Sequence, residues 1–157
     1  AYDARLARVV AAFDPDLIVL AGWMLLLSDA FLDRFPDRVV NIHPALLPDD
    51  GGPVVETSRG ILPALRGARA VRDALRRGLP ITGATVHLVT LACDAGPVLA
   101  RAEAPILAGD DEARLHERIK AIEHRLLPAA IGRLLAERNE RQHAGRPDEL
   151  AIGGVNR

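Results

Sequence analysis

Cysteine is almost absent from this chain of 157 residues, in which Cys93 is the only one. No disulfide can form within the sequence, and no cluster of thiolates can hold a metal ion. A reduced, cytoplasmic location is therefore expected. Hydrophobic runs such as residues 17–22 are far shorter than the roughly 20 residues that cross a bilayer, so no association with a membrane is expected.

An excess of positive charge is absent as well, because 20 Lys and Arg stand against 21 Asp and Glu. The formal net charge is -1, and Lys120 is the only lysine. Proteins that bind nucleic acids usually carry a basic face, so nucleic acid is not an expected partner. The length suits one domain, and the 49% of hydrophobic residues are enough for a substantial core.

The apolar pattern predicts an α/β fold. Residues 17–20 and 38–42 are short apolar runs, typical of buried strands, with a helical segment between them. Residues 82–90 and 97–106 alternate like strands around the short connection 91–96, which predicts an antiparallel hairpin near the C-terminal half. We expect a mainly parallel, Rossmann-like sheet with helices on both faces.

A long helix should follow the hairpin. Asp110 or Asp111 can cap its start, and the helix should run to about residue 136, with Pro128 kinking or interrupting it. Residues 137–157 are polar and contain glycine and proline, so we expect a peripheral or loose tail there. The expected catalytic domain is residues 1–136.

Asn41 and His43 stand two residues apart at the end of a predicted buried strand. Residues at this spacing share one face of a strand, and ligands of open α/β sheets bind beyond the carboxyl ends of strands. A neutral amide donor beside an imidazole, whose ordinary pKa is about 6.5, could stabilise a developing oxyanion. A structural histidine fits the same pattern and remains the alternative.

Asp94 lies on the connection between the last two predicted strands. Loop aspartates usually cap turns. Alternatively, the loop folds over the strand end, and the carboxylate meets His43, raises the pKa of its imidazole and holds its orientation. The pair could then move protons in acyl transfer, an effect worth about 10²–10⁴-fold in rate. His87 is interpreted as a buried core histidine, and Cys93 as unreactive. The histidines and Cys93 lack diagnostic metal-ligand spacing, so no metal is expected.

Four segments, in order along the chain, resemble the folate-dependent formyltransferase family. They are DLIVLAGWM at 16–24, VNIHPALLP at 40–48, GATVHLVT with DAGPVL between 83 and 99, and IEHRLLP at 122–128. The resemblance extends from about Tyr2 to Leu135. It is greatest to the glycinamide ribonucleotide formyltransferases of purine biosynthesis, which the segment around Glu123 favours. Hydrolases of formyl-folate share the second segment.

The resemblance implies transfer of a formyl group from 10-formyltetrahydrofolate, the donor cosubstrate, to the amine of glycinamide ribonucleotide, without an acyl-enzyme or a metal. Asn41 and protonated His43 would bind the tetrahedral oxyanion. Asp94 would support His43 and relay the amine's proton. The resemblance leaves a homodimer open.

The same resemblance implies the binding residues. Lys120 and Glu123 would approach the ribonucleotide, with Lys120 near its phosphate. The pteridine of the reduced folate would lie against Trp23, Met24, Leu25, Leu26 and Leu27, with the backbone of Leu91, Ala92, Cys93 and Asp94 closing over it.

Two features depart from the family. The family opens with a strand and a glycine-rich loop whose backbone N–H groups bind the substrate phosphate, and no segment here matches them. We therefore expect the N-terminal part of the family fold to be missing from this sequence. Residues 49–64 stand as an insertion, for which a flexible loop is favoured over a lid.

Two alternatives to formyl transfer remain open. The same residues could act on water and hydrolyse 10-formyltetrahydrofolate. The chain could also be a non-catalytic fragment that binds folate.

Overall fold

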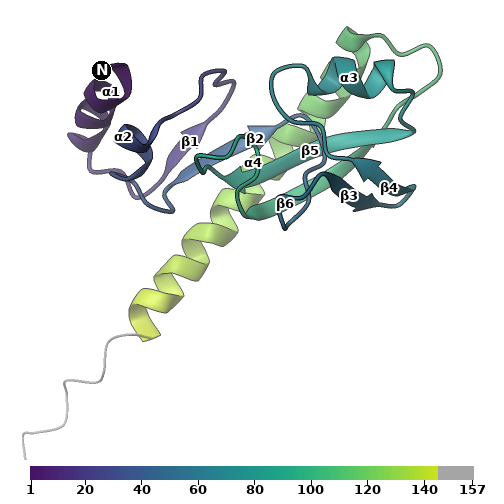
Figure 1. The fold of residues 1–157 in the computed structure, drawn as a ribbon. Helices are drawn as coiled ribbons and strands as arrows, with labels where there is room; N and C mark the ends of the chain where they lie inside the picture. Colours follow the sequence, from purple (N-terminus) through teal and green to yellow (C-terminus); the bar gives the residue numbers. More distant parts are fainter. Residues whose placement is uncertain (145–157) are drawn as a thin grey trace, which may run out of the picture.

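The computed structural model describes residues 1–144 of the chain (Figure 1). Its elements are, in chain order, α1 (Tyr2–Ala11), β1 (Ile18–Leu20), α2 (Asp29–Leu32), β2 (Val39–His43), β3 (Val54–Thr57), β4 (Gly60–Pro63), α3 (Ala70–Arg76), β5 (Ile81–Leu88), β6 (Val98–Pro105) and α4 (Glu112–Ala144).

The central sheet has the strand order β1-β2-β5-β6. The α/β class and the C-terminal antiparallel hairpin, β5 with β6, are confirmed. The sheet is mixed rather than mainly parallel in the part of the chain described, because β1 and β2 pair in parallel whereas β2 and β5 pair antiparallel. Val40 pairs with Leu88 and His43 with Thr85, so the chain enters β5 from the end where β2 stops.

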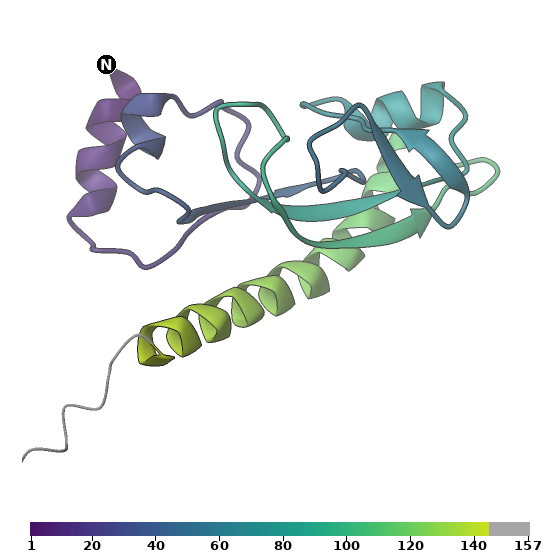
Figure 2. The same ribbon diagram turned by 60° about the horizontal axis from the view of Figure 1, so that its bottom comes forward.

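The two faces of the sheet are covered differently. Val40 of β2 and Val86 of β5 are buried against Ala130 of α4, which lies along one face (Figure 2). Their neighbours in sequence point to the opposite face. There Val39 packs in a cluster with Phe31 of α2 and residues of α1. The expectation of helices on both faces is therefore confirmed, and the remaining part of the second face carries Asn41, His43, Thr85 and His87.

The β3–β4 hairpin covers the far end of that second face. Val55 is buried with Leu46 and Ile81, and the backbone N–H of Ser58 donates to Glu103 at 2.8 Å. The expectation of a flexible insertion at 49–64 is therefore wrong. The pairing of β3 with β4 and the burial of Val55 fold these residues onto the sheet.

Helix α4 begins as expected, because Asp111 accepts the backbone N–H of Arg114 at 2.8 Å. It continues without interruption through Pro128. Because Pro128 is exposed, the backbone carbonyl four residues earlier, which receives no N–H from proline, can be hydrated by solvent. The helix also extends past residue 136 to Ala144, where Arg138 donates to the backbone of Asp16 and Asp37. No helix within residues 1–144 is both long and apolar enough to cross a membrane.

The remainder of the expected tail, residues 145–157, lies outside the described residues. The domain boundary at residue 136 stays a prediction.

Candidate active site

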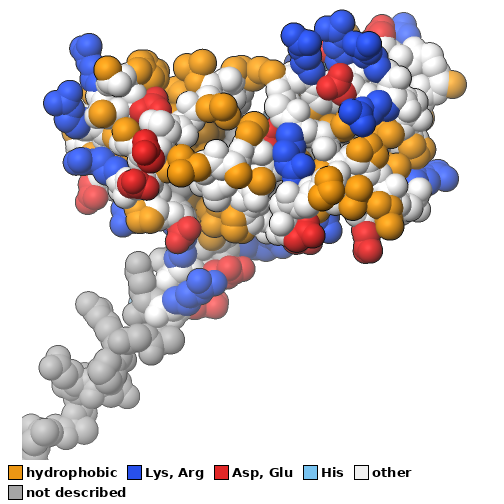
Figure 3. Space-filling model, in the orientation of Figure 1, with side chains coloured by type: hydrophobic (Ala, Val, Ile, Leu, Met, Phe, Trp, Pro, Cys, Tyr) orange, Lys and Arg blue, Asp and Glu red, His pale blue; other side chains and the backbone are white. Residues whose placement is uncertain are grey.

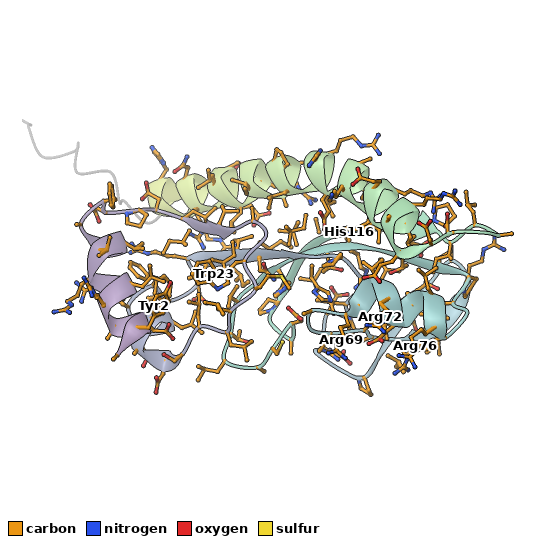
Figure 4. All side chains as sticks on the ribbon, turned by 90° about the horizontal axis from the view of Figure 1, so that it is seen from above. Tyr2, Trp23, Arg69, Arg72, Arg76 and His116 are labelled. Atoms are coloured by element: carbon orange, nitrogen blue, oxygen red, sulfur yellow. The ribbon has the colours of Figure 1, made fainter. Side chains whose placement is uncertain are left out.

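A cavity of about 490 Å³ opens where β1 and β2 end, within the range of roughly 300–1,000 Å³ typical of small-molecule sites. In Figure 4, Trp23 lies on one side of this region and His116 of α4 on the other. The cavity has an apolar wall from the segment after β1 and a polar wall from β2, β5 and the loop before β6. Its lining includes Trp23, Met24, Leu25, Leu26, Leu27, Asn41, His43, His87, Leu91, Cys93, Asp94, Glu112, His116 and Glu123.

The apolar wall gathers the residues expected to bind folate. All five from Trp23 to Leu27 line the cavity, as do Leu91 and Cys93, whereas Ala92 does not. Leu26 is 75% exposed and Met24 71%, and exposed apolar side chains grouped at a cavity indicate a binding surface. The indole Nε1 of Trp23 is buried and has no hydrogen-bond partner among residues 1–144.

The polar wall brings together the three residues expected to be catalytic. Asn41 and His43 share one face of β2, and the Asp94 loop folds over that face. His43 Nδ1 lies 3.5 Å from Asp94 Oδ2. Asp94 adopts a left-handed backbone conformation, with φ of 48°, which is uncommon for a residue other than glycine and lets the loop turn its carboxylate inward.

His87 is the functional candidate that sequence reasoning missed. It is buried, as expected for a core residue, but its Nε2 lies 3.5 Å from Asp94 Oδ1 and 3.4 Å from Asn41 Nδ2. Its Nδ1 donates to the backbone carbonyl of Leu88 at 2.9 Å, which leaves Nε2 to face the site. The antiparallel pairing of Asn41 with His87 creates this contact, and only the strand register could have revealed it.

Backbone groups of the Leu65–Gly67 turn complete the polar wall. The carbonyl oxygen of Leu65 accepts the Nε2–H of His43 at 2.7 Å. The backbone N–H of Gly67 donates to Asp94 Oδ2 at 2.8 Å. No side-chain pattern in the sequence could signal these contacts, because the groups involved belong to the main chain.

Burial and hydrogen bonding set the charge states of the polar wall. Burial raises the pKa of Asp94, but the hydrogen bond with His87, the charge of His43 and the Gly67 N–H together outweigh it and hold the pKa well below its ordinary value. Asp94 is therefore a carboxylate at neutral pH.

For His43 the order of effects reverses. Burial lowers its pKa by more than the Asp94 carboxylate and the Leu65 carbonyl raise it, so the net shift is downward. The expected upward effect of Asp94 on the pKa of His43 is therefore present but smaller than the opposing effect of burial, and the catalytic role of protonated His43 stays a prediction. Its Nε2–H donates to the carbonyl of Leu65, and its Nδ1 faces the Asp94 carboxylate.

Helix α4 contributes a further, acidic side of the cavity. Glu123 lines it together with Glu112 and His116, at spacings that place them along one side of the helix. Burial raises the pKa of Glu123. Lys120 does not line the cavity, and its ammonium donates to Glu117 at 2.7 Å. In residues 1–144, His, Cys, Asp and Glu side chains form no group of three or more that could hold a metal ion.

The formyl transferase family matches residues 1–131. The chain belongs to this family. Among its relatives, phosphoribosylglycinamide formyltransferase of Mycobacterium tuberculosis is 47% identical over 134 residues, and that of Escherichia coli is 37% identical over 131 residues. These matches cover 85% and 83% of this chain and 55% of each relative. The chain therefore spans just over half the length of these family members.

A solved structure supports the family fold. The crystal structure of glycinamide ribonucleotide transformylase 1 from Symbiobacterium toebii superposes with a TM-score of 0.75 at 43% identity. The superposition covers 87% of this chain and 57% of that one.

Proposed function

We propose that this chain forms the formyl-transfer site of an enzyme that moves a formyl group from 10-formyltetrahydrofolate to the amine of glycinamide ribonucleotide. One observation carries the proposal: Asn41, His43 and Asp94 meet at the polar wall of a cavity whose other wall is apolar. Such a cavity suits a donor with a flat, largely apolar ring and a reactive polar group. The relatives named phosphoribosylglycinamide formyltransferase support the acceptor.

The donor would lie against the apolar wall. Its pteridine ring would contact the side chains of residues 23–27, and the backbone of residues 91–93 would close over it.

The acceptor would approach from α4. The carboxylate of Glu123 faces the cavity and would bind the ribonucleotide. Lys120 would first leave Glu117, at small cost because both partners are largely exposed, at 43% and 72%. Its ammonium would then be free for the phosphate.

The reaction itself requires no covalent bond to the protein. The amine nitrogen attacks the formyl carbon, and negative charge develops on the formyl oxygen. The bond between the formyl carbon and N10 then breaks. N10 gains a proton and the amine nitrogen loses one, so the exchange balances without another reactant.

Three side chains would share the work. Asn41 would donate its amide N–H to the developing oxyanion, a contribution worth about 10²–10³-fold in rate. Asp94 would receive the amine's proton and pass it to N10 as the bond between the formyl carbon and N10 breaks. The imidazolium form of His43, stabilised by the Asp94 carboxylate 3.5 Å away, would strengthen the positive field on the oxyanion.

Product analysis with the 157-residue chain tests this proposal. The chain is mixed with saturating 10-formyltetrahydrofolate, with and without glycinamide ribonucleotide, and formylated amine and formate are both measured. We expect formylated amine, and its loss in His43→Ala. Formate released at the same rate without the amine would instead identify a hydrolase. Folate binding without turnover in either mixture would identify a non-catalytic fragment.

Location and assembly are secondary parts of the proposal. The exposed free thiol of Cys93 is compatible with a reducing cytoplasm. A homodimer stays a prediction, which the molecular mass in solution would test.

A further inference from the structure

Arg66 connects three segments that are distant in the chain. Its Nε–H donates to the backbone carbonyl of Asp94 at 3.0 Å. Its Nη2 donates to the carbonyls of Gly51 at 2.9 Å and Gly52 at 2.7 Å. The planar guanidinium presents its donors in fixed directions, so these bonds set the distance between the start of the inserted segment and the Asp94 loop.

The inserted segment also presses directly on this loop. Gly51 has a φ of 67°, and a Cβ at this position would lie 2.9 Å from the carbonyl oxygen of Ala95. Only glycine allows this approach without strain. The turn at 51–52 and the turn at 94–95 are therefore packed main chain against main chain, with the Arg66 side chain across both.

Arg66 stands between two residues that hold the polar wall. Leu65 accepts a hydrogen bond from His43, and Gly67 donates one to the Asp94 carboxylate. Residues 65–67 thus hold Asp94 by two hydrogen bonds. The Arg66 side chain donates to its main-chain carbonyl, and the Gly67 N–H donates to its carboxylate. The left-handed backbone of Asp94 needs such support, because this conformation is unfavourable for a residue with a side chain.

We propose that Arg66 is a positioning residue for formyl transfer. It holds the main chain of Asp94 so that the carboxylate stays between the imidazoles of His43 and His87, each 3.5 Å away. Through Gly51 and Gly52 it ties this arrangement to the start of the inserted hairpin. The expected effect on kcat rests on the proposed function, whereas the expected effect on the position of the Asp94 carboxylate rests on the hydrogen bonds alone.

The test compares three variants. Arg66→Met removes the donors but keeps the length of the side chain, and Arg66→Ala leaves a space that free guanidinium can enter. Arg72→Met is the matched control, because Arg72 is exposed on α3 (Figure 4) and its side chain makes no hydrogen bond within residues 1–144. Basic side chains gather on the surface over α3 (Figure 3).

We expect kcat to fall about 100-fold in Arg66→Met, because a displacement of about 1 Å at a reacting group has this effect. KM should change less than about threefold, since the apolar wall and α4 are untouched. Millimolar guanidinium should restore activity to Arg66→Ala but not to Arg66→Met, whose side chain fills the space. Arg72→Met should behave as the unsubstituted chain.

A second readout does not depend on turnover. In Arg66→Met, the pKa of the Asp94 carboxyl, followed by carbon NMR, should rise toward its ordinary value as contacts with His87 and Gly67 loosen. If the unsubstituted chain transfers no formyl group, the proposed function fails, while this titration still decides the role of Arg66. An unchanged titration of the Asp94 carboxyl would overturn the inference. So would a lower kcat accompanied by a higher KM and a lower Tm, if guanidinium does not restore activity.

Discussion

The two walls of the cavity differ in burial and order. On the apolar wall, Leu26 is 75% exposed and belongs to a segment without regular secondary structure. On the polar wall, His87 is 2% exposed, and both of its ring nitrogens have hydrogen-bond partners. One wall can adjust to a ligand, and the other is held before any ligand arrives. This difference suits acyl transfer, in which the groups facing developing charge contribute most when they need not reorganise. Substitutions on the polar wall should therefore affect the rate, and those on the apolar wall should affect binding.

The largest effect is expected for Asp94→Asn. The substitution keeps the shape but removes the charge that stabilises an imidazolium at His43, so kcat should fall about 10²–10⁴-fold with little change in KM. Steady-state kinetics with both substrates would measure it. Asp33→Asn, at the exposed position directly after α2, is the control. Equal kcat in the two variants would remove Asp94 from the chemistry.

A smaller loss is expected for His87→Gln. His87 supports Asp94 from the side opposite His43, so its loss should loosen the carboxylate and lower kcat about 10- to 100-fold. His124→Gln, exposed on α4, should leave the rate unchanged. If kcat survives in His87→Gln while Tm drops, the histidine is only a core residue, as first interpreted from the sequence.

Acid should destabilise the protein through the same wall. Because the pKa of Asp94 is depressed in the folded state, its stabilising contribution is full above the unfolded pKa of about 3.9 and is lost as the pH falls toward the folded value. The pKa of His43 is also lowered, so stability should begin to decline below the unfolded imidazole pKa of about 6.5.

Tm measured against pH separates these two contributions. Asp94→Asn should have a flatter Tm profile than the unsubstituted chain below about pH 5. Profiles of the same slope would mean that the Asp94 carboxyl has an ordinary pKa.

The smallest effect is expected for Leu26→Ala on the apolar wall. The side chain is exposed without ligand, so truncation should cost little stability and weaken reduced-folate binding by about fivefold, equivalent to about 1 kcal/mol of lost apolar contact. Folate titration followed by Trp23 fluorescence would measure it. Ile61→Ala, equally apolar and 67% exposed on the β3–β4 hairpin, is the control. A fall in kcat without a change in folate affinity would contradict the division between the walls.

The sequence alone predicted the strands of the central sheet and the start of α4, since these depend on local periodicity and capping. It also predicted that Asn41 and His43 share one face of a strand, and it suggested a contact between His43 and Asp94. In the structure, His43 Nδ1 lies 3.5 Å from Asp94 Oδ2. The inserted hairpin escaped prediction. Its strands have 4 residues each, too few for a clear periodic signal, and they are stabilised by packing onto β5.

Residue types and spacing thus determined which groups could act on a formyl group. Only the tertiary structure decided three further points: the direction of β5, the placing of His87 beside Asn41, and the burial that lowers the pKa of His43. Each of these depends on which distant segments meet, because register, burial and main-chain hydrogen bonds arise between segments and leave no local pattern in the chain.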